Sequence, residues 1–274
     1  MNIYHIGRQQ LTLILRSKWL ISFGLLFVLL AFFVTYFSQS GSSGFEGFNR
    51  MTASLLNLNL LMIPLISLLM GSLFLAGEKE DSGLLLLLTY PISFWAVILG
   101  KYLGLFVSVG TVLSIGYGVS LLSMYLVNSY ISLLVIAKFY ILSLLLAAIF
   151  ISLAMVIGVR AKTRFQALGI SLILWAMAVL FYEFLIMGIS SFLPTTAILT
   201  LLTSTVFLNP IEIVRVWSIL ALDGASIFGP SLYELTVWAN GWKGQVIFIL
   251  TSALWVVLPI LISSFYIRKG VEND

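Results

Sequence analysis

The chain has 274 residues, of which 61% are hydrophobic and only 9% are charged. A soluble globular protein is about 45–50% apolar and about 25% charged, so a soluble domain of this length could not hide so much apolar surface from water, whereas a lipid bilayer can. The chain has no cysteine and one histidine, which excludes disulfides, thiolate metal sites and a histidine-based catalytic pair in the membrane. The net charge of +4 does not require a nucleic-acid partner, because basic residues on one side of a membrane account for it.

The first 18 residues are predicted to form a helix that lies on the cytoplasmic leaflet. Apolar residues recur there at near-helical spacing, and Arg8, Thr12 and Arg16 fall together on another side. The apolar residues are Ile3, Ile6, Leu11, Ile14 and Leu15. The alternative for residues 1–18 is an unstructured basic tail.

Six apolar runs follow, each close to the length of about 20 residues that a helix needs to cross the hydrocarbon core. They cover residues 19–37, 55–77, 102–127, 131–159, 165–189 and 246–267. The first run is too long for the apolar part of a cleaved signal peptide and ends in Tyr36 and Phe37, not in small residues. The predicted fold class is therefore an all-α integral membrane protein, with one six-span domain over residues 19–274.

The distribution of lysine and arginine predicts the orientation of these spans. With the N-terminus in the cytoplasm, ten of the 14 basic residues lie on the cytoplasmic side and four outside. The four are Arg50, Lys138, Arg215 and Lys243. Because cytoplasmic loops carry the excess of basic residues, we expect a multi-pass protein of the inner membrane with both termini in the cytoplasm.

Residues 190–241 are mostly apolar but are interrupted repeatedly by proline and charged residues. A span within this segment would carry Arg268 and Lys269 to the outside, against the charge bias. We predict short external helices, partly re-entrant, before the last span. Lys138 and Glu183 are predicted near the outer ends of their spans, either at the interface or in a transport pathway.

The densest signal lies between the second and third runs, at residues 77–101. Three acids, Glu78, Glu80 and Asp81, precede a short apolar helix predicted from Leu84 to Thr89, and Pro91 ends it. This helix is too short to cross a bilayer and too apolar to be solvated, so it lies in the interface or docks into another protein; a plain interfacial loop is the alternative. The Gly100-Lys101 pair lacks the rest of a P-loop, which excludes ATP binding of that kind by this chain.

This stretch resembles the signature of the type-2 ABC transporter permease family. The matching residues are Glu78, Lys79, Glu80, Leu84, Leu87, Leu88, Pro91, Ile92, Ile98, Leu99, Gly100 and Lys101. Ser82-Gly83 replaces the usual Gly-Thr pair, and Phe94 replaces a frequent arginine. The order of six spans and the basic turn at residues 160–164 fit the same family.

The resemblance implies a permease that is not itself an enzyme and binds no cofactor or metal. A separate ABC ATPase subunit, with ATP and Mg²⁺, would dock on the cytoplasmic side, and a second copy of the chain or a close relative would complete the dimer in the lipid bilayer. The implied ATPase-coupling residues are Glu78, Glu80, Asp81, Leu84, Leu87, Pro91, Arg160, Lys162 and Arg164.

A narrower likeness is to family members that serve the maturation of nitrous-oxide reductase, a copper enzyme. It rests on residues 86–91 and 208–215, and it implies a periplasmic accessory protein bound through the external segment. The implied contact residues are Asn209, Pro210, Glu212, Arg215 and Asp223. The alternatives are a type-2 exporter of lipid, antibiotic or peptide, and an ATP-independent carrier or membrane scaffold.

Overall fold

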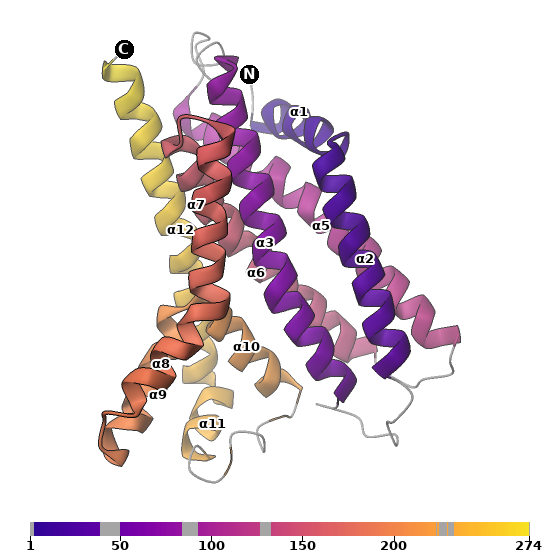
Figure 1. Ribbon diagram of the computed structural model, residues 1–274, viewed down its shortest axis with the longest axis vertical. Helices are drawn as coiled ribbons and strands as arrows, with labels where there is room; N and C mark the ends of the chain where they lie inside the picture. The colour runs from indigo at the N-terminus through magenta and orange to yellow at the C-terminus, as the bar shows by residue number, and fades with distance from the viewer. Residues whose placement is uncertain are drawn as a thin grey trace.

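The computed structural model describes residues 3–38, 50–83, 93–126, 133–222, 224, 229 and 233–273, which are mostly helical with no strand among them (Figure 1). In chain order the helices are α1 (Ile3–Leu15), α2 (Lys18–Ser38), α3 (Arg50–Glu80), α5 (Phe94–Leu126), α6 (Leu133–Arg160) and α7 (Arg164–Ala176). They continue with the π-helical turn η2 (Met177–Phe181), α8 (Tyr182–Ser190), α9 (Thr195–Leu208), α10 (Pro210–Ala221), α11 (Tyr233–Asn240) and α12 (Trp242–Asn273).

Six of these helical segments are long and apolar enough to cross a membrane, which confirms the predicted fold class. They are Lys18–Phe37, Arg50–Glu80, Phe94–Ser123, Leu133–Arg160, Arg164–Ser190 and Trp242–Arg268. The second and third segments begin several residues before the predicted boundaries, at Arg50 and Phe94. The apolar runs marked only the part that crosses hydrocarbon, whereas the helices continue into polar sequence at their ends.

Helices α3 and α6 form the centre of the bundle. The apolar windows of these two helices are 72% and 67% buried inside the chain, against 39% or less for the other four. Glycines bring their backbones together: a Cβ at Gly71 would lie 2.5 Å from the Cβ of Ala154, and one at Gly158 would lie 2.7 Å from the Cβ of Leu75. Small residues at such contacts are what membrane helices use to pack closely.

The fifth span is the least embedded part of the bundle. Along α7, only Ala167 and Ser171 are buried, and no residue of η2 or α8 is. After the π-helical turn, α8 departs from the bundle and runs beside α9 at the lower left of Figure 1. Helices α8 and α9 thus form a hairpin whose outer surface carries exposed apolar side chains, including Phe184 and Phe192.

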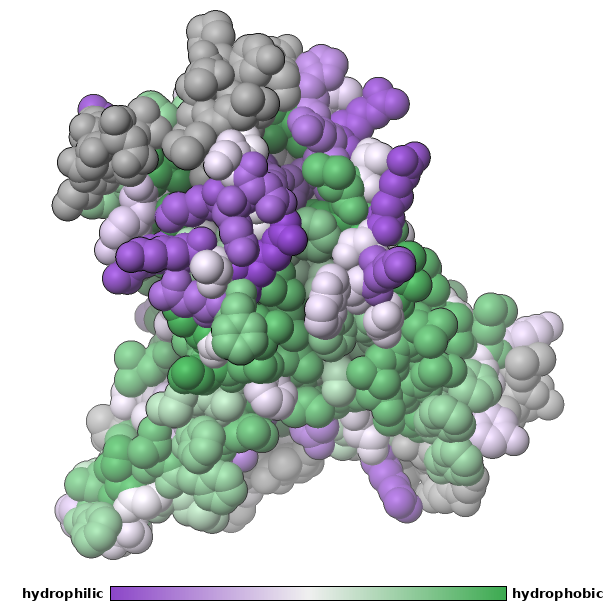
Figure 2. Space-filling model, turned by 45° about the horizontal axis from the view of Figure 1, so that its top comes forward, coloured by the Kyte–Doolittle hydropathy of each residue, from purple (hydrophilic) through white to green (hydrophobic). Residues whose placement is uncertain are grey.

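The two ends of the bundle differ in composition. Both termini lie at one end, at the top of Figure 1, and hydrophilic side chains gather there above a broad apolar band (Figure 2). We call this the basic end, because it carries Lys79, Arg160 and Arg164 at the ends of α3, α6 and α7. Helices α9, α10 and α11 lie at the opposite end, so the described part of the segment before the last span is mainly helical, as predicted.

Helix α1 is a separate helix, as the sequence predicts for part of residues 1–18. It buries Ile6, Gln10 and Ile14, one side chain per turn, while Ile3 and Leu15 are exposed. A Cβ at Gly100 of α5 would lie 2.8 Å from the Cβ of Ile6, so α1 packs closely on α5. Its position on a lipid surface stays a prediction.

Candidate functional site

At the basic end, the last turn of α3 is joined to the first turn of α7. The Glu80 carboxylate accepts a hydrogen bond of 2.8 Å from the backbone N–H of Arg164, and the Asp81 carboxylate pairs with the Arg164 guanidinium. Lys79 Nζ donates to the Val159 carbonyl at the end of α6, at 2.8 Å. The first N–H groups of a helix have no partner inside the helix, and Glu80 supplies one for Arg164. The negative charge of Glu80 also interacts favourably with the positive end of the α7 dipole.

The turn before α7 is itself fixed by local hydrogen bonds. Thr163 is the N-cap of α7 and its hydroxyl accepts from the Gln166 backbone N–H at 3.2 Å. The Gln166 side chain in return accepts from the Lys162 backbone N–H at 2.8 Å. This reciprocal capping holds the basic turn in one conformation at the surface.

A second ion pair lies deeper at the same end. Lys101 of α5 pairs with Glu78 of α3, and Lys101 Nζ donates to Gln10 Oε1 of α1 at 3.3 Å. The side chains of Lys101 and Glu78 are 5% and 24% exposed, whereas those of Arg164 and Asp81 are 55% and 63% exposed. The buried pair therefore ties three helices together, and the exposed pair leaves its charges accessible.

The structure brings four of the predicted coupling residues into one cluster: Glu78, Glu80, Asp81 and Arg164. We call these residues, with Lys101, the basic-end cluster. The Lys162 side chain is exposed on the adjoining turn, while the Arg160 guanidinium lies 5.0 Å above the ring of Tyr266 on α12. The predicted residues Leu84, Leu87 and Pro91, with the short helix expected there, lie outside the described residues.

The backbone after α3 adopts at Ser82 a conformation that suits the glycine of the family pattern. Ser82 has a φ of 59°, in the left-handed region that normally favours glycine. The family pattern has glycine at this position. The turn geometry is therefore kept here with a residue that adopts it less readily.

At the opposite end, two carboxylates share one guanidinium. Arg215 of α10 pairs with Glu183 of α8, and its Nη1 lies 3.2 Å from Glu212 Oε1. Burial raises the pKa of the Glu212 carboxyl, Arg215 opposes that rise, and Glu183 adds to it. Sequence reasoning placed Glu183 at the outer end of the fifth span but did not find its partner, because 32 residues separate it from Arg215.

Asn209 and Pro210 are used inside the chain. Asn209 is the N-cap of α10: its side-chain oxygen accepts from the Ile211 backbone N–H at 3.0 Å, and its Nδ2 donates to the Ala178 carbonyl in η2 at 2.8 Å. Pro210 takes the first helical position, where no backbone N–H is needed. Both residues are buried, which disfavours the predicted contact of their side chains with a partner.

Of the two further predicted residues of the external segment, the structure describes one. Arg215 is half-buried between Glu183 and Glu212, and Asp223 lies outside the described residues.

Lys138 Nζ donates to the Ala221 carbonyl at 2.6 Å, at the end of α10. In the described part of the chain, no group of three or more His, Asp or Glu residues could hold a metal ion.

Comparison with known proteins agrees with this arrangement over almost the whole chain. Two relatives are described as probable ABC transporter permease proteins NosY. The one from Pseudomonas aeruginosa is 32% identical over 266 residues, covering 94% of this chain and 92% of the relative. The one from Stutzerimonas stutzeri is 27% identical over 273 residues, covering 97% and 98%. Residues 4–267 match the model of the ABC-2 family transporter proteins, and the chain belongs to that family.

Proposed function

We propose that this chain is the permease subunit of an ATP-driven transporter of the NosY kind, which links a cytoplasmic ATPase to a periplasmic partner during maturation of nitrous-oxide reductase. Near full-length similarity to two proteins named NosY supports this proposal. ATP and Mg²⁺ belong to the ATPase subunit, and two copies of the permease form the membrane part. This chain contributes no catalytic residue.

The observation that carries the proposal is the basic-end cluster. A permease driven by another subunit needs a contact surface that moves as a unit with its spans. Glu80 and Asp81 at the end of α3 are joined to Arg164 at the start of α7, so these contacts favour movement of the two surface turns together. Because α3 is the most buried of the six spans, force applied at this surface reaches the centre of the bundle.

The same cluster includes the N-terminal helix. Lys101 connects Glu78 on α3 with Gln10 on α1, so a displacement of α3 is passed to α1 as well as to α5. The exposed charges of Asp81 and Arg164 then remain available for an ATPase. The inner pair, Lys101 and Glu78, connects the helices, and the outer pair, Arg164 and Asp81, is exposed to a partner. Both properties are expected of a surface that transmits movement from an ATPase to the spans.

Co-purification of the tagged protein from its native membrane, followed by mass spectrometry, tests the proposal. We expect an ABC ATPase and a periplasmic protein to be recovered together. Charge reversal by Arg164→Glu should lower the recovery of the ATPase about tenfold, which corresponds to about 1.4 kcal/mol. The control Lys243→Glu reverses an exposed basic residue at the start of α12, at the opposite end, and should leave recovery of the ATPase unchanged.

The outcomes separate the rival functions. Recovery of an ATPase without a periplasmic protein would favour an exporter of lipid, antibiotic or peptide. Recovery of neither would favour an ATP-independent carrier or a scaffold and would overturn the proposal. Phe192→Ala tests the periplasmic contact and should lower the recovery of the periplasmic protein, because Phe192 is exposed at the α8–α9 hairpin. Deletion of residues 209–223 is a less specific test, because it removes α10, which is largely buried, and would disturb the fold.

A further inference from the structure

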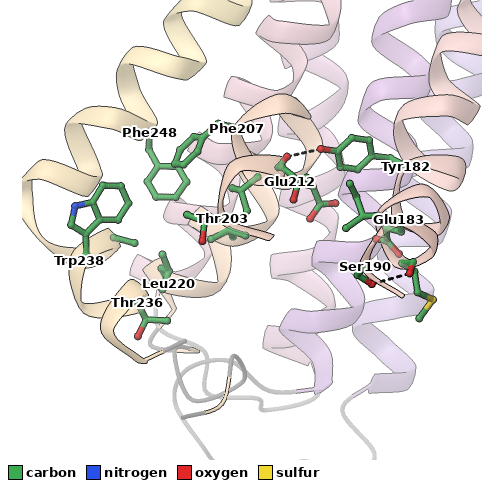
Figure 3. Close-up of a pocket in the computed structure, with 16 residues that line it drawn as sticks. Tyr182, Glu183, Ser190, Thr203, Phe207, Glu212, Leu220, Thr236, Trp238 and Phe248 are labelled. Carbon is green, nitrogen blue, oxygen red and sulfur yellow. Dashed lines mark hydrogen bonds between the residues drawn. The ribbon is translucent and has the colours of Figure 1, made fainter. Parts of the chain in front are cut away.

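Beside Glu183 and Glu212 the structure holds a cavity of about 450 Å³, walled by α8, α9, α10, α11 and α12 (Figure 3). This volume lies within the range of about 300–1,000 Å³ in which proteins bind small molecules. The cavity is at the end opposite the basic-end cluster. Nothing in the proposed coupling of an ATPase makes use of it.

The walls of the cavity are of two kinds, on two sides. Phe207, Trp238 and Phe248 form an aromatic side, and Tyr182, Glu183 and Glu212 lie on the other side (Figure 3). Helix α10 connects the two, because Glu212, Val216 and Leu220 follow one another at four-residue spacing along its cavity face. An occupant must therefore be apolar along most of its length and polar at one end.

The polar side has an excess of negative charge. Arg215 is the partner that the described ion pairs give to both Glu183 and Glu212, so two carboxylates face one guanidinium. The Tyr182 hydroxyl is already engaged, since it donates to the Thr205 carbonyl at 2.6 Å. Ionised carboxylates only accept hydrogen bonds, so the complementary headgroup is a cation that donates them.

The cavity reaches the apolar surface of α8. Met187 belongs to the cavity wall and is also 71% exposed. Phe184 and Leu185, its neighbours on α8, are exposed as well. The cavity is therefore open to an apolar surface beside its polar side, where the headgroup of an amphiphile would lie.

We propose that this cavity binds an amphiphile with a hydrocarbon chain and a primary ammonium headgroup. The chain lies against Phe207, Trp238 and Phe248, and the ammonium group donates to the carboxylates of Glu183 and Glu212. An aminophospholipid of the surrounding membrane and a free long-chain amine both have this chemistry. The inference does not depend on the identity of the periplasmic partner.

The absence of cysteine from the chain makes a direct test possible, because any introduced cysteine is unique. Val216→Cys places a thiol in the cavity wall, and Ser204→Cys places one on an exposed position of α9 outside it. Each variant is reconstituted in nanodiscs of phosphatidylcholine and phosphatidylglycerol, and the rate of labelling by N-ethylmaleimide is measured. Dodecylamine should slow the labelling of Val216→Cys about tenfold, as an occupied site does at about ten times its dissociation constant.

Three controls determine whether the headgroup is recognised. Dodecanoate has the same chain with an anionic head and should protect Val216→Cys far less. Ser204→Cys should react at the same rate with and without dodecylamine. Adding Glu183→Gln and Glu212→Gln to Val216→Cys should remove the preference for dodecylamine over dodecanoate. If Val216→Cys does not fold, Thr203→Cys occupies the same wall and takes its place.

The source of the ligand is distinguished by a second set of nanodiscs. Protection by phosphatidylethanolamine alone identifies a membrane lipid, and protection by dodecylamine alone identifies a free amphiphile; either result supports the proposal. Equal protection by dodecylamine and dodecanoate, or no protection by either dodecylamine or phosphatidylethanolamine, overturns it. Loss of the ATPase or of the periplasmic partner in the co-purification would leave this labelling result unaffected, so the two proposals fail separately.

Discussion

At the scale of single residues, the two ion pairs of the basic-end cluster have different physical roles. Lys101 is almost completely buried and has Glu78 as its counter-charge, whereas Arg164 and Asp81 are both more than half exposed. An exposed pair is screened by water and salt, and a buried charge that loses its partner is not. The three acids at residues 78–81 therefore do not form one uniform docking patch.

We expect Glu78→Gln to destabilise the protein by about 3 kcal/mol, because it leaves the Lys101 ammonium buried without a compensating charge. Asp81→Asn should cost less than about 1 kcal/mol, because its pair with Arg164 is exposed. Thermal unfolding in mild detergent measures both variants. Equal losses in the two variants would contradict this distinction.

The sequence predicted these acids but not their partners. Glu78, Glu80, Asp81 and Arg164 were identified by their charge and by the family pattern, and the structure places all four together. Glu78 and Lys101 are more than 20 residues apart, and their pairing depends on how α3, α5 and α1 pack. The spacing of residues along one sequence does not predict such packing. The same holds for Asn209, which looks like an exposed loop residue in the sequence but is buried as a helix cap.

At the scale of elements, the contact between α3 and α6 depends on glycine. Gly71→Ala should destabilise the protein by about 1–3 kcal/mol, because the new methyl group overlaps the Cβ of Ala154 and forces the helices apart. Gly118→Ala on α5 is the matched control. Among the described residues, no side chain and no backbone of another helix lies within 4 Å of its added methyl group, so it should be neutral or stabilising by up to about 1 kcal/mol.

Apparent melting temperature and the recovery of monodisperse protein both report this difference. A Gly71→Ala variant as stable as Gly118→Ala would show that the α3–α6 contact relaxes without cost.

The apolar runs predicted the existence and order of all six spans, since the hydrocarbon thickness sets their length. Their ends were predicted less well, because amphipathic and polar sequence such as the start of α3 continues a helix beyond the apolar part. The π-helical turn at Met177–Phe181 was not predicted at all. It contains no proline or glycine, and Asn209, the residue that supplies a hydrogen bond to its Ala178 carbonyl, comes 31 residues later.

At the scale of the whole molecule, the unequal distribution of basic residues predicts which end faces the cytoplasm. Lys162 is exposed at the basic end and Ser191 is exposed at the α8–α9 hairpin. In intact spheroplasts, a membrane-impermeant maleimide should label Ser191→Cys and should label Lys162→Cys only after the membrane is opened. Labelling of Lys162→Cys in intact spheroplasts would reverse the predicted orientation.

The π-helical turn also sets the rotational phase of everything that follows it in the fifth span. An α-helix turns by about 100° per residue, so removing one residue between Met177 and Phe181 would rotate α8 by about that angle while leaving α7 in place on α3. Tyr182 and Glu183 would then point away from α9 and α10, and Arg215 would lose one of its two carboxylates. A single residue of chain length in this turn thus decides which side chains the hairpin presents to the cavity.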